Sequence, residues 1–364
     1  MNDDALEKLR QRIDAIDEQL LELFNQRASC AVDVAGVKRE LNEAVDESID
    51  FFRPDREAQV IKRLKSLNKG PLSDDEVGRL IREVMSACLA LEQPLKIAYL
   101  GPEGTFTQSA ALKHFGHSVS TIPMSSIPDV FNSVESGHAD YGLVPVENST
   151  EGVISHTLDM FLGSNLKVCG EVEIRVHHHL ATRSQDVSGI RHIYSHQQSF
   201  AQCRRWLDQN FPGIERIPVS SNAEAARLAS IESEAGAICG LPAVEIFGLK
   251  ICYENIEDLS DNTTRFVIIG SQDVGPSGND KTSLLISTKN IPGALLGLLQ
   301  PLADHGISMN KIESRPAQGS KWAYVFFIDI DGHQLDGNVV QALDELKQQA
   351  ALFKILGSYP KASL

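Results

Sequence analysis

The sequence has few cysteines and no long apolar run. Its six cysteines are scattered along 364 residues, and no two of them form a CxxC pair. This spacing favours reduced thiols in a cytoplasm over a disulfide framework or a zinc site. No apolar run approaches the length of a membrane-spanning helix, and the charged N-terminal stretch lacks the apolar core of a signal peptide. We therefore expect a cytoplasmic protein that makes no use of a membrane.

Positive charge is also scarce, because 34 lysines and arginines stand against 49 acidic residues and leave a net charge of −15. This balance argues against nucleic acid and anionic membranes as partners, but a small anionic substrate fits if cations gather locally. The motifs GxGxxG, GxxxxGK[ST] and GxSxG are absent, so nucleotide binding and serine-hydrolase chemistry are poor candidates. The length allows two or three domains, each with an ordinary core.

Residues 1–93 predict helices only. Proline is absent from residues 5–41, which predicts one helix roughly 50 Å long at 1.5 Å per residue. Three helices of one chain cannot bury the apolar stripe of such a helix, so we expect a partner subunit. A second helix should begin at Pro54 and stop at Gly70, and a third should follow a capping box at Ser73.

Charged side chains interrupt the apolar stripes of these helices. Arg27 and Lys38 fall on the stripe of the first helix, whereas Glu57 and Glu92 fall on those of the second and third. Buried charges are costly unless they are paired. Two interpretations stay open at this point: structural salt bridges, or a pocket whose cations bind the carboxylates of a small polyanion.

The stretches LRQRIDAIDEQLLELFNQRASCAVDVAGVK, RPDREAQVIKRL and SACLALEQP resemble the all-helical chorismate mutase family. The resemblance implies an intertwined dimer and a rearrangement of chorismate to prephenate that needs no cofactor, proton transfer or nucleophile. It implies a catalytic role for Lys38, Glu57 and Glu92, and substrate binding by Arg10, Arg27, Arg56 and Cys88.

Three positions depart from the pattern of that family. Glu92 stands where many members have glutamine, so it must be protonated to donate a hydrogen bond to the ether oxygen, and burial can raise its pKa enough. Cys88 stands where serine is common. Arg53 stands where some members have an acid, which leaves Glu57 as the partner of the substrate hydroxyl.

Residues 96–271 alternate short apolar strands with helices, which predicts an α/β sheet. Ligands of such sheets bind at the carboxyl ends of strands and near helix N-termini. Hydroxyl and amide side chains gather at these places, namely Thr105, Asn148, Ser149, Thr150, Ser195 and the stretch DNTTRF at 261–266. They suit a small molecule that bears carboxylates. His177 and His179 would share one face of a strand, but no acid or cysteine follows at ligand spacing, so we expect no metal.

The set GPEGTF, VPVENSTEG, YSHQQSFAQC and DNTTRF resembles prephenate dehydratase. The resemblance implies two α/β lobes around a cleft, as in periplasmic binding proteins, formed by 96–175 with 250–270 and by 176–249. It also implies loss of a hydroxyl and CO₂ from prephenate, with Thr264 as the acid and Arg265 as the anchor of a carboxylate. Neighbours in a strand face opposite sides, so either the strand starts later or one of the two roles is wrong. Thr263 is interpreted as an ordinary residue at a strand start.

Residues 271–281 have the composition of a linker, and residues 282–360 follow the βαββαβ order of ferredoxin-like folds. The motifs GALL and ESRP resemble those of an ACT regulatory domain. That resemblance implies allosteric binding of phenylalanine by Gly293, Ala294, Leu295, Leu296, Glu313, Ser314, Arg315 and Pro316. A plain dimerisation module is the alternative. Pro301 predicts a kink or break in the helix that contains it.

These patterns predict a multidomain protein with an all-α helical domain at 1–95, a two-lobed α/β domain at 96–271 and an α+β ferredoxin-like domain at 282–360. We expect a bifunctional enzyme of phenylalanine biosynthesis, an isomerase and a lyase, that needs no cofactor or metal. It should form a homodimer or a higher oligomer and be inhibited by phenylalanine. Two alternatives stay open: a non-catalytic amino-acid sensor, and an enzyme that prefers arogenate to prephenate.

Overall fold

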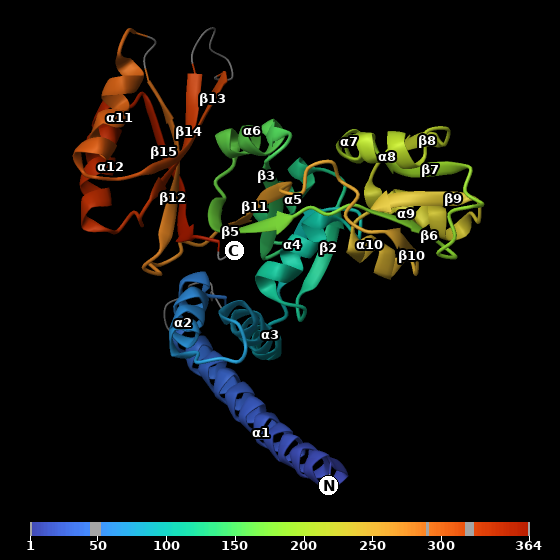
Figure 1. Cartoon of the computed structure of the whole chain (residues 1–364). Helices are drawn as coiled ribbons and strands as arrows, with labels where there is room; N and C mark the ends of the chain where they lie inside the picture. Colours follow the sequence, from blue (N-terminus) through green and yellow to red (C-terminus); the bar gives the residue numbers. More distant parts are fainter. Residues whose placement is uncertain (1, 44–51, 289–290, 317–323, 363–364) are drawn as a thin grey trace. The chain divides into compact units, whose positions relative to one another are not determined.

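The computed structural model describes residues 2–43, 52–288, 291–316 and 324–362 (Figure 1). The chain divides into two compact units, one formed by Met1–Leu95 with Phe115–Ser120 and the other by Lys96–His114 with Thr121–Leu364. Among the described residues, no helix is both long enough and apolar enough to cross a membrane.

The first unit contains the three predicted helices, α1 (Asn2–Glu43), α2 (Pro54–Leu67) and α3 (Asp74–Glu92). Pro54 occupies the first turn of α2, and the Ser73 hydroxyl accepts the backbone N–H of Glu76 to cap α3. Both α1 and α2 pack against α3.

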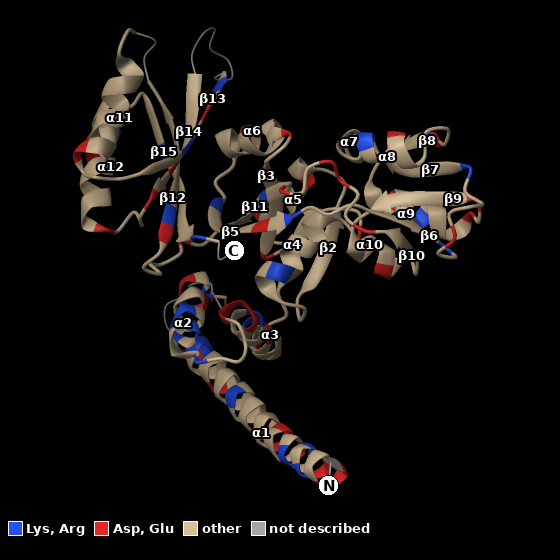
Figure 2. Ribbon diagram, in the orientation of Figure 1, with Lys and Arg blue, Asp and Glu red and all other residues tan. Residues whose placement is uncertain are grey.

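Helix α1 has 42 residues, which is about 63 Å at 1.5 Å per residue. Its apolar stripe is largely uncovered within this chain, since Leu9, Ile13 and Leu23 are 56 to 58 % exposed. Charges of both signs alternate along the rest of its surface (Figure 2). An exposed stripe of this length fits the expectation that another surface covers it.

The second unit begins with a mixed sheet in the order β2-β1-β3-β11-β5, with β4 paired to β3. Its strands are β1 (Lys96–Leu100), β2 (Ser120–Met124), β3 (Tyr141–Asn148), β4 (Gly152–Val153), β5 (Lys167–Arg175) and β11 (Thr263–Gly270). Its helices are α4 (Phe106–Phe115), α5 (Ile127–Glu135) and α6 (Ser155–Gly163). This sheet forms the first lobe of the predicted α/β domain.

A second sheet, in the order β10-β6-β9-β7-β8, forms the other lobe. Its strands are β6 (His179–Thr182), β7 (His192–His196), β8 (Glu215–Val219), β9 (Ala235–Cys239) and β10 (Lys250–Tyr253). The helices are α7 (Gln197–Gln202), α8 (Arg204–Asn210), α9 (Asn222–Ile231) and α10 (Leu241–Ile246). Because β10 pairs with β6, the assignment of residues 250–253 to the first lobe was wrong. The chain returns to the first lobe only at β11.

The last part of the chain is the expected βαββαβ unit, with the strand order β13-β14-β12-β15 of a ferredoxin-like fold. Its elements are β12 (Asp280–Ser287), α11 (Ala294–Asp304), β13 (Met309–Pro316), β14 (Tyr324–Asp331), α12 (Gly337–Gln349) and β15 (Leu352–Pro360). Helices α11 and α12 cover one face of the sheet (Figure 1). Helix α11 continues through Pro301 to Asp304, so the break expected at this proline does not occur.

The uncovered face of this last sheet packs on the first lobe. Leu285, Phe327 and Leu356 belong to the same buried cluster as Val168 of β5 and Val267 of β11. The strand that carries Thr264 is therefore in direct contact with the ferredoxin-like domain.

Candidate active sites

Thr264 and Asn148 lie opposite each other in the pairing of β11 with β3. The Asn148 Nδ2 group donates a hydrogen bond of 2.8 Å to Thr264 Oγ1. The direction of this bond is set by the backbone, because Asn148 Oδ1 accepts the N–H groups of Thr150 and Glu151, each at 3.0 Å. With its carbonyl oxygen turned to these donors, the amide must present its NH₂ to Thr264. The Thr264 hydroxyl is thus the acceptor in this contact and keeps its proton for another group.

A polar network extends from this pair toward the second lobe. Asn148 Nδ2 also donates to Asn262 Oδ1 at 2.8 Å, and Asn262 Nδ2 donates to Gln202 Oε1 at 3.1 Å. His178 Nε2 lies 2.8 Å from the same Gln202 oxygen, so it carries the proton. Burial lowers the pKa of His178, which keeps the ring neutral. Through these hydrogen bonds, residues of both lobes are linked to the Asn148–Thr264 pair.

This network borders a cavity of about 390 Å³. The cavity is lined by Thr150, Glu151, Ala201, Gln202, Arg204, Arg205, Glu257, Asp258, Leu259 and Asn262. Its volume suits a small cyclic substrate. Arg204 and Arg205 supply the cationic part of the wall.

Two of the carboxylates in the cavity wall are engaged by the protein itself. Glu257 Oε1 lies 2.7 Å from His177 Nδ1 and Oε2 accepts the backbone N–H of His178, and against the effect of burial these bonds lower the pKa of Glu257. Asp258 accepts the backbone N–H groups of Arg205 and Trp206 at the start of α8. Because the carboxylates of Glu257 and Asp258 are already bonded to backbone N–H groups and an imidazole, they repel an anionic ligand less than free carboxylates do.

The histidine run does not lie in one strand, because β5 ends at Arg175 and β6 begins at His179. Glu257 comes close to His177 in space although it is 80 residues away in sequence, so the spacing of acids along the chain could not reveal it. No group of three metal-ligating side chains occurs among the described residues.

Of the other residues predicted to bind substrate, Thr150 lines the cavity, whereas Thr105 and Ser149 bond to backbone atoms. Thr150 belongs to the site, since its Oγ1 lies 2.5 Å from Asn148 Oδ1 and the residue lines the cavity. Thr105 donates to the backbone oxygen of Pro102 in the loop before α4. Ser149 contacts backbone atoms, because its Oγ accepts the N–H of Thr263 and donates to the carbonyl of Asp261.

Ser195 is completely buried, with its Oγ 3.1 Å from both Asn222 Oδ1 and the Ile238 carbonyl oxygen. A side chain with no exposed surface cannot touch a substrate, so the predicted binding role of Ser195 is corrected to support of the turn that begins α7. The same Asn222 oxygen accepts the backbone N–H of His196 and the Ser199 hydroxyl.

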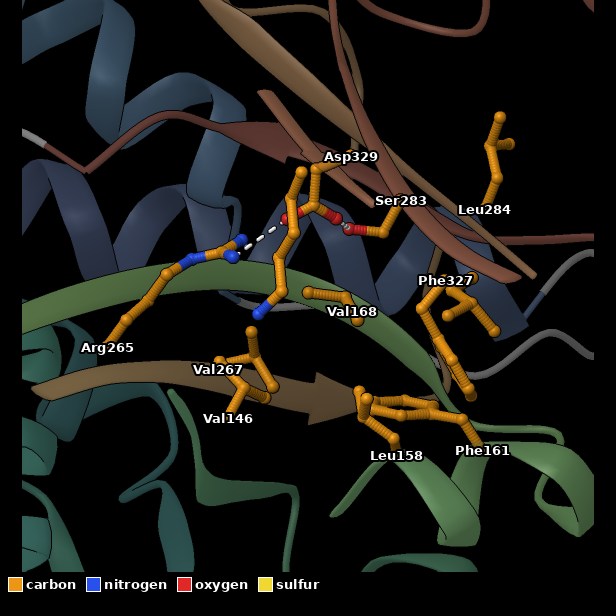
Figure 3. Close-up of a pocket in the computed structure, with 12 residues that line it drawn as sticks. Val146, Leu158, Phe161, Val168, Arg265, Val267, Ser283, Leu284, Phe327 and Asp329 are labelled. Carbon is orange, nitrogen blue, oxygen red and sulfur yellow. Dashed lines mark hydrogen bonds and ion pairs between the residues drawn. The ribbon is translucent and has the colours of Figure 1, made fainter. Parts of the chain in front are cut away.

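The structure also corrects the substrate-binding role predicted for Arg265. Strand β11 starts at Thr263, so Thr264 and Arg265 point to opposite faces of the sheet. The Arg265 guanidinium contacts Glu171 at 2.8 Å, Asp329 at 2.7 Å and the Tyr359 hydroxyl at 3.1 Å. Figure 3 shows the contact with Asp329. Of the two roles inferred for this dipeptide, the anchoring of a substrate carboxylate by Arg265 is the one that fails.

In the helical unit, Lys38 and Arg27 act electrostatically on Glu92 at the end of α3. Burial raises the pKa of Glu92 although these cations and Arg39 oppose it. Glu92 Oε2 is buried and has no hydrogen-bond partner among the described residues. A buried oxygen of this kind is stabilised by protonation or by a donor on a ligand.

The remaining residues predicted for the mutase site are spread out. Glu57 pairs with Arg82 at 2.9 Å, and burial raises the pKa of Glu57 even against this cation. Cys88 is buried, whereas Arg10 and Arg56 are exposed. Arg10 lies 17 residues before Arg27 on the same helix, which is about 26 Å along its axis.

The two motifs of the ferredoxin-like domain lie at one edge of its sheet, because β12 and β13 are both antiparallel to β14. Gly293 caps α11 with φ of +79°, a conformation that favours glycine. Arg315 reaches out of the domain instead, to Asp159 at 2.9 Å and to the Ser155 hydroxyl at 2.8 Å on α6.

Sequence reasoning covered Asn262 only as part of the stretch DNTTRF and gave His178 only a structural or cleft-lining role. It did not single out Gln202 or Glu257. Gln202, His178 and Glu257 come from separate segments, and no pattern in the sequence joins them.

Comparison with known proteins identifies three segments in order. Models of the families "Chorismate mutase type II", "Prephenate dehydratase" and "ACT domain" match residues 9–93, 97–274 and 282–348. Proteins named bifunctional chorismate mutase/prephenate dehydratase from Pseudomonas aeruginosa and Neisseria gonorrhoeae are 54 % and 50 % identical to this chain. The alignments cover 99 % and 100 % of this chain and 99 % of each relative.

Two solved structures resemble the second unit. A prephenate dehydratase from Arthrobacter aurescens, in complex with L-Phe, is 34 % identical over 73 % of this chain and 90 % of its own, with a TM-score of 0.67. GqqA, described as a novel type of quorum-quenching acylase, is 30 % identical over 74 % of this chain and 98 % of its own, with a TM-score of 0.68. The domain models and the full-length relatives together show that the chain belongs to the bifunctional chorismate mutase/prephenate dehydratase family.

Proposed function

We propose that the helical domain rearranges chorismate to prephenate and that the two-lobed domain converts prephenate to phenylpyruvate, with Thr264 as the proton donor of the second reaction. The observation that carries this proposal is the direction of the Asn148–Thr264 hydrogen bond. Because Thr264 accepts from Asn148, its own proton is available to a substrate hydroxyl in the cleft.

The dehydration then proceeds as a decarboxylative elimination. The bond between the ring and its carboxylate breaks and releases CO₂, and the electron pair shifts through the ring as the C–O bond to the hydroxyl breaks. The leaving oxygen takes the Thr264 proton and departs as water, and the threonine regains a proton from solvent. Aromatisation supplies the driving force, so a weak acid such as threonine is sufficient when it is well placed.

Asn148 stabilises the charge that this step creates. As the proton leaves Thr264, negative charge develops on Oγ1, where the Asn148 NH₂ group already donates at 2.8 Å. A donor that is in place before the reaction needs no reorganisation during it. In the cavity that Thr150 and Asn262 of this network line, Arg204 and Arg205 are candidate partners for the two carboxylates of the substrate.

The mutase site is proposed to include the cluster of Arg27, Lys38 and Glu92. The cations would bind the substrate carboxylates, and a protonated Glu92 would donate to the ether oxygen of the breaking C–O bond. The exposed stripe on α1 supports a homodimer in which a second copy covers it. Arg10 lies about 26 Å along α1 from Arg27, which suits a residue that completes the site of the partner subunit.

Phenylalanine is proposed to inhibit through the ACT domain. A relative with the same second unit has been crystallised with L-Phe. The left-handed Gly293 at the start of α11 allows a ligand to approach the backbone closely. A cytoplasmic location, where the six free cysteines would stay reduced, completes the proposal.

A coupled assay tests the whole proposal. Purified full-length protein should convert chorismate to phenylpyruvate without added metal or cofactor, and phenylalanine should slow the second step. Arogenate should be offered in parallel with prephenate, because a preference for arogenate is the second candidate. A protein that binds phenylalanine but consumes neither chorismate nor prephenate would be a sensor, and the enzymatic proposal would fail.

A further inference from the structure

The residues next to the proposed catalytic pair face the ACT domain. In the pairing of β11 with β3, Thr264 is opposite Asn148 and Arg265 is opposite Glu147. Side chains alternate along a strand, so one pair points to the cleft and its neighbour to the opposite face of the same ladder. The backbone between the two pairs is a single peptide unit in each strand.

The ACT domain holds both residues of the second pair by charge. Asp329 of β14 binds Arg265 at 2.7 Å, and Lys311 of β13 binds Glu147 at 2.7 Å. The Tyr359 hydroxyl of β15 accepts a further bond from Arg265. Three of the four strands in the ACT sheet thus contact the ladder one residue away from Thr264 or Asn148.

This contact is largely buried and balanced in charge. The side chains of Arg265, Asp329 and Lys311 are 11 to 15 % exposed, whereas that of Glu147 is 40 % exposed, so the Arg265–Asp329 pair is the buried one. Lys281 and Glu171 add a further pair at 2.8 Å, so three cations meet three carboxylates. Removing one partner of a buried ion pair is strongly destabilising, because the other charge is left without compensation. The ladder therefore cannot shift away from the ACT sheet without a large cost.

A small cavity lies beside these ion pairs. It has a volume of about 30 Å³ and is lined by Arg265, Lys311, Asp329 and Ser283 on its polar side (Figure 3). Val146, Val168 and Phe327 form the apolar side. The interface is thus held by directional charge contacts around a space that close packing does not fill.

We propose that Arg265 and Glu147 are positioning residues of the dehydratase, and that Asp329 and Lys311 of the ACT domain fix the Asn148–Thr264 geometry through them. The inference rests on the proposed role of Thr264. It assigns the ACT sheet a part in building the dehydratase site even when no effector is bound. It also explains why an arginine follows the catalytic threonine although it does not face the cleft.

The test uses two variants of the full-length chain, Asp329→Asn and Lys311→Met. Each removes one charge on the ACT side and leaves every residue of the cleft in place. Small displacements of a catalytic group are costly, so we expect the dehydratase kcat to fall roughly 10- to 100-fold while KM changes by about twofold or less. The mutase rate of the same chains should stay unchanged. Lys311→Arg keeps the pair with Glu147 and should restore most of the rate.

Asp331→Asn is the matched control. Asp331 lies two residues after Asp329 on the same strand. Its side chain bonds Lys361 and Asn310 and acts electrostatically on Lys281, whereas Asp329 bonds Arg265 of β11 directly. This variant should keep the wild-type dehydratase rate. An equal loss in Asp329→Asn and Asp331→Asn would mean general damage to the ACT fold and would overturn the inference.

A double-mutant cycle separates positioning from instability. In a Thr264→Val background, Asp329→Asn should cause little further loss of kcat, because the group that it positions is already absent. Fully additive losses would overturn the inference. The two proposals also fail in different ways. A wild-type rate in Thr264→Val contradicts the catalytic role of Thr264, whereas a slow Thr264→Val with a normal Asp329→Asn contradicts only the role of the ACT sheet.

Discussion

The Asn148 amide faces Thr264 with its nitrogen, 2.8 Å from Oγ1, while its oxygen is held by the backbone N–H groups of Thr150 and Glu151. One side chain thereby fixes both the fold of the loop after β3 and the proton direction at Thr264. The two functions of the amide can be tested separately, because an aspartate at position 148 can hold the loop but cannot donate to Thr264.

Asn148→Asp should accordingly keep the loop and lose the dehydratase. The carboxylate still accepts the two backbone N–H groups, but its second oxygen accepts a hydrogen bond from the Thr264 hydroxyl, where the amide nitrogen of Asn148 donates one to Oγ1. General acid catalysis is typically worth about 10²–10⁴-fold, and we expect a loss of kcat on that scale. Steady-state assays with prephenate measure it, with the mutase rate as an internal control. A rate near that of wild type would show that the polarity of Asn148 does not matter.

Thr264→Val preserves the shape of the side chain and removes its hydroxyl. The dehydratase kcat should fall by about 10²–10⁴-fold, since the proton donor is gone. Thr263→Val is the matched control, because the half-buried Thr263 donates its hydroxyl proton to the Asp261 carbonyl oxygen, at 3.4 Å. It should cost much less. Greater sensitivity at Thr263 would move the acid by one residue and invalidate the site described above.

The motifs that specify this fold are local, and local patterns were sufficient to predict most of it. Pro54 and the Ser73 cap mark the starts of α2 and α3, and the alternation of strands and helices gave the class of the second unit. The lobe boundary near residue 250 could not be predicted in this way. Whether β10 pairs with β6 or joins the first sheet depends on long-range contacts that leave no periodic signal.

The candidate site shows the same contrast between local patterns, which the sequence reveals, and long-range contacts, which it does not. Asn148, Thr150 and Thr264 were predicted because they stand in distinctive short motifs, and the structure brings their side chains together. Arg265 stands in the same motif, yet it faces the ACT sheet, because its partners Glu171 and Asp329 come from strands that only the tertiary fold brings together. The alternation of neighbours along a strand was predicted, but the motif does not say which of the two residues faces the ACT sheet.

Glu92 should give the mutase a pH dependence. Burial raises the pKa of its carboxyl, and the protonated form is the one that can donate to the ether oxygen. Activity should therefore be full below this pKa and fall as the pH rises through it. Glu92→Gln supplies a permanent donor and should flatten the profile on the alkaline side. The pH dependence of kcat/KM for chorismate measures both, and an unchanged profile in the glutamine variant would exclude Glu92 from this role.

Lys38→Ala should abolish the mutase and leave the dehydration of added prephenate nearly intact, because Lys38 belongs to the first compact unit and Thr264 to the second. Parallel assays with chorismate and with prephenate separate the two effects. Comparable loss of both activities would indicate unfolding or a shared site.

Arg10→Ala extends this test to the subunits. If Arg10 completes the partner's site, neither Arg10→Ala nor Lys38→Ala has mutase activity alone, but mixed dimers contain one site with both residues intact. Co-refolded mixtures should regain up to roughly a quarter of the wild-type mutase rate, as expected for statistical pairing in a dimer. No recovery in a mixture shown to exchange subunits would place Arg10 outside the partner's site.

Gly293→Ala should weaken inhibition by phenylalanine and spare catalysis. Gly293 has φ of +79°, a conformation that costs an alanine roughly 1–2 kcal/mol, whereas in the described part of the chain no atom outside its neighbours lies within 4 Å of the added methyl group. The domain should thus stay folded while the backbone that approaches the ligand is altered.

A coupling of about 1–3 kcal/mol between effector and substrate corresponds to a 5- to 150-fold change in affinity, and linkage requires that prephenate weaken phenylalanine binding by the same factor. Calorimetric titration of phenylalanine into full-length Thr264→Val, with and without prephenate, measures that factor while the substrate is consumed slowly.

Deleting residues 282–364 should abolish inhibition as well, but it also removes Asp329 from Arg265 and should lower kcat, so the point variant is the cleaner test. If Gly293→Ala and the truncated chain both stay as sensitive to phenylalanine as the wild type, the effector acts at the catalytic cleft and not at the ACT domain.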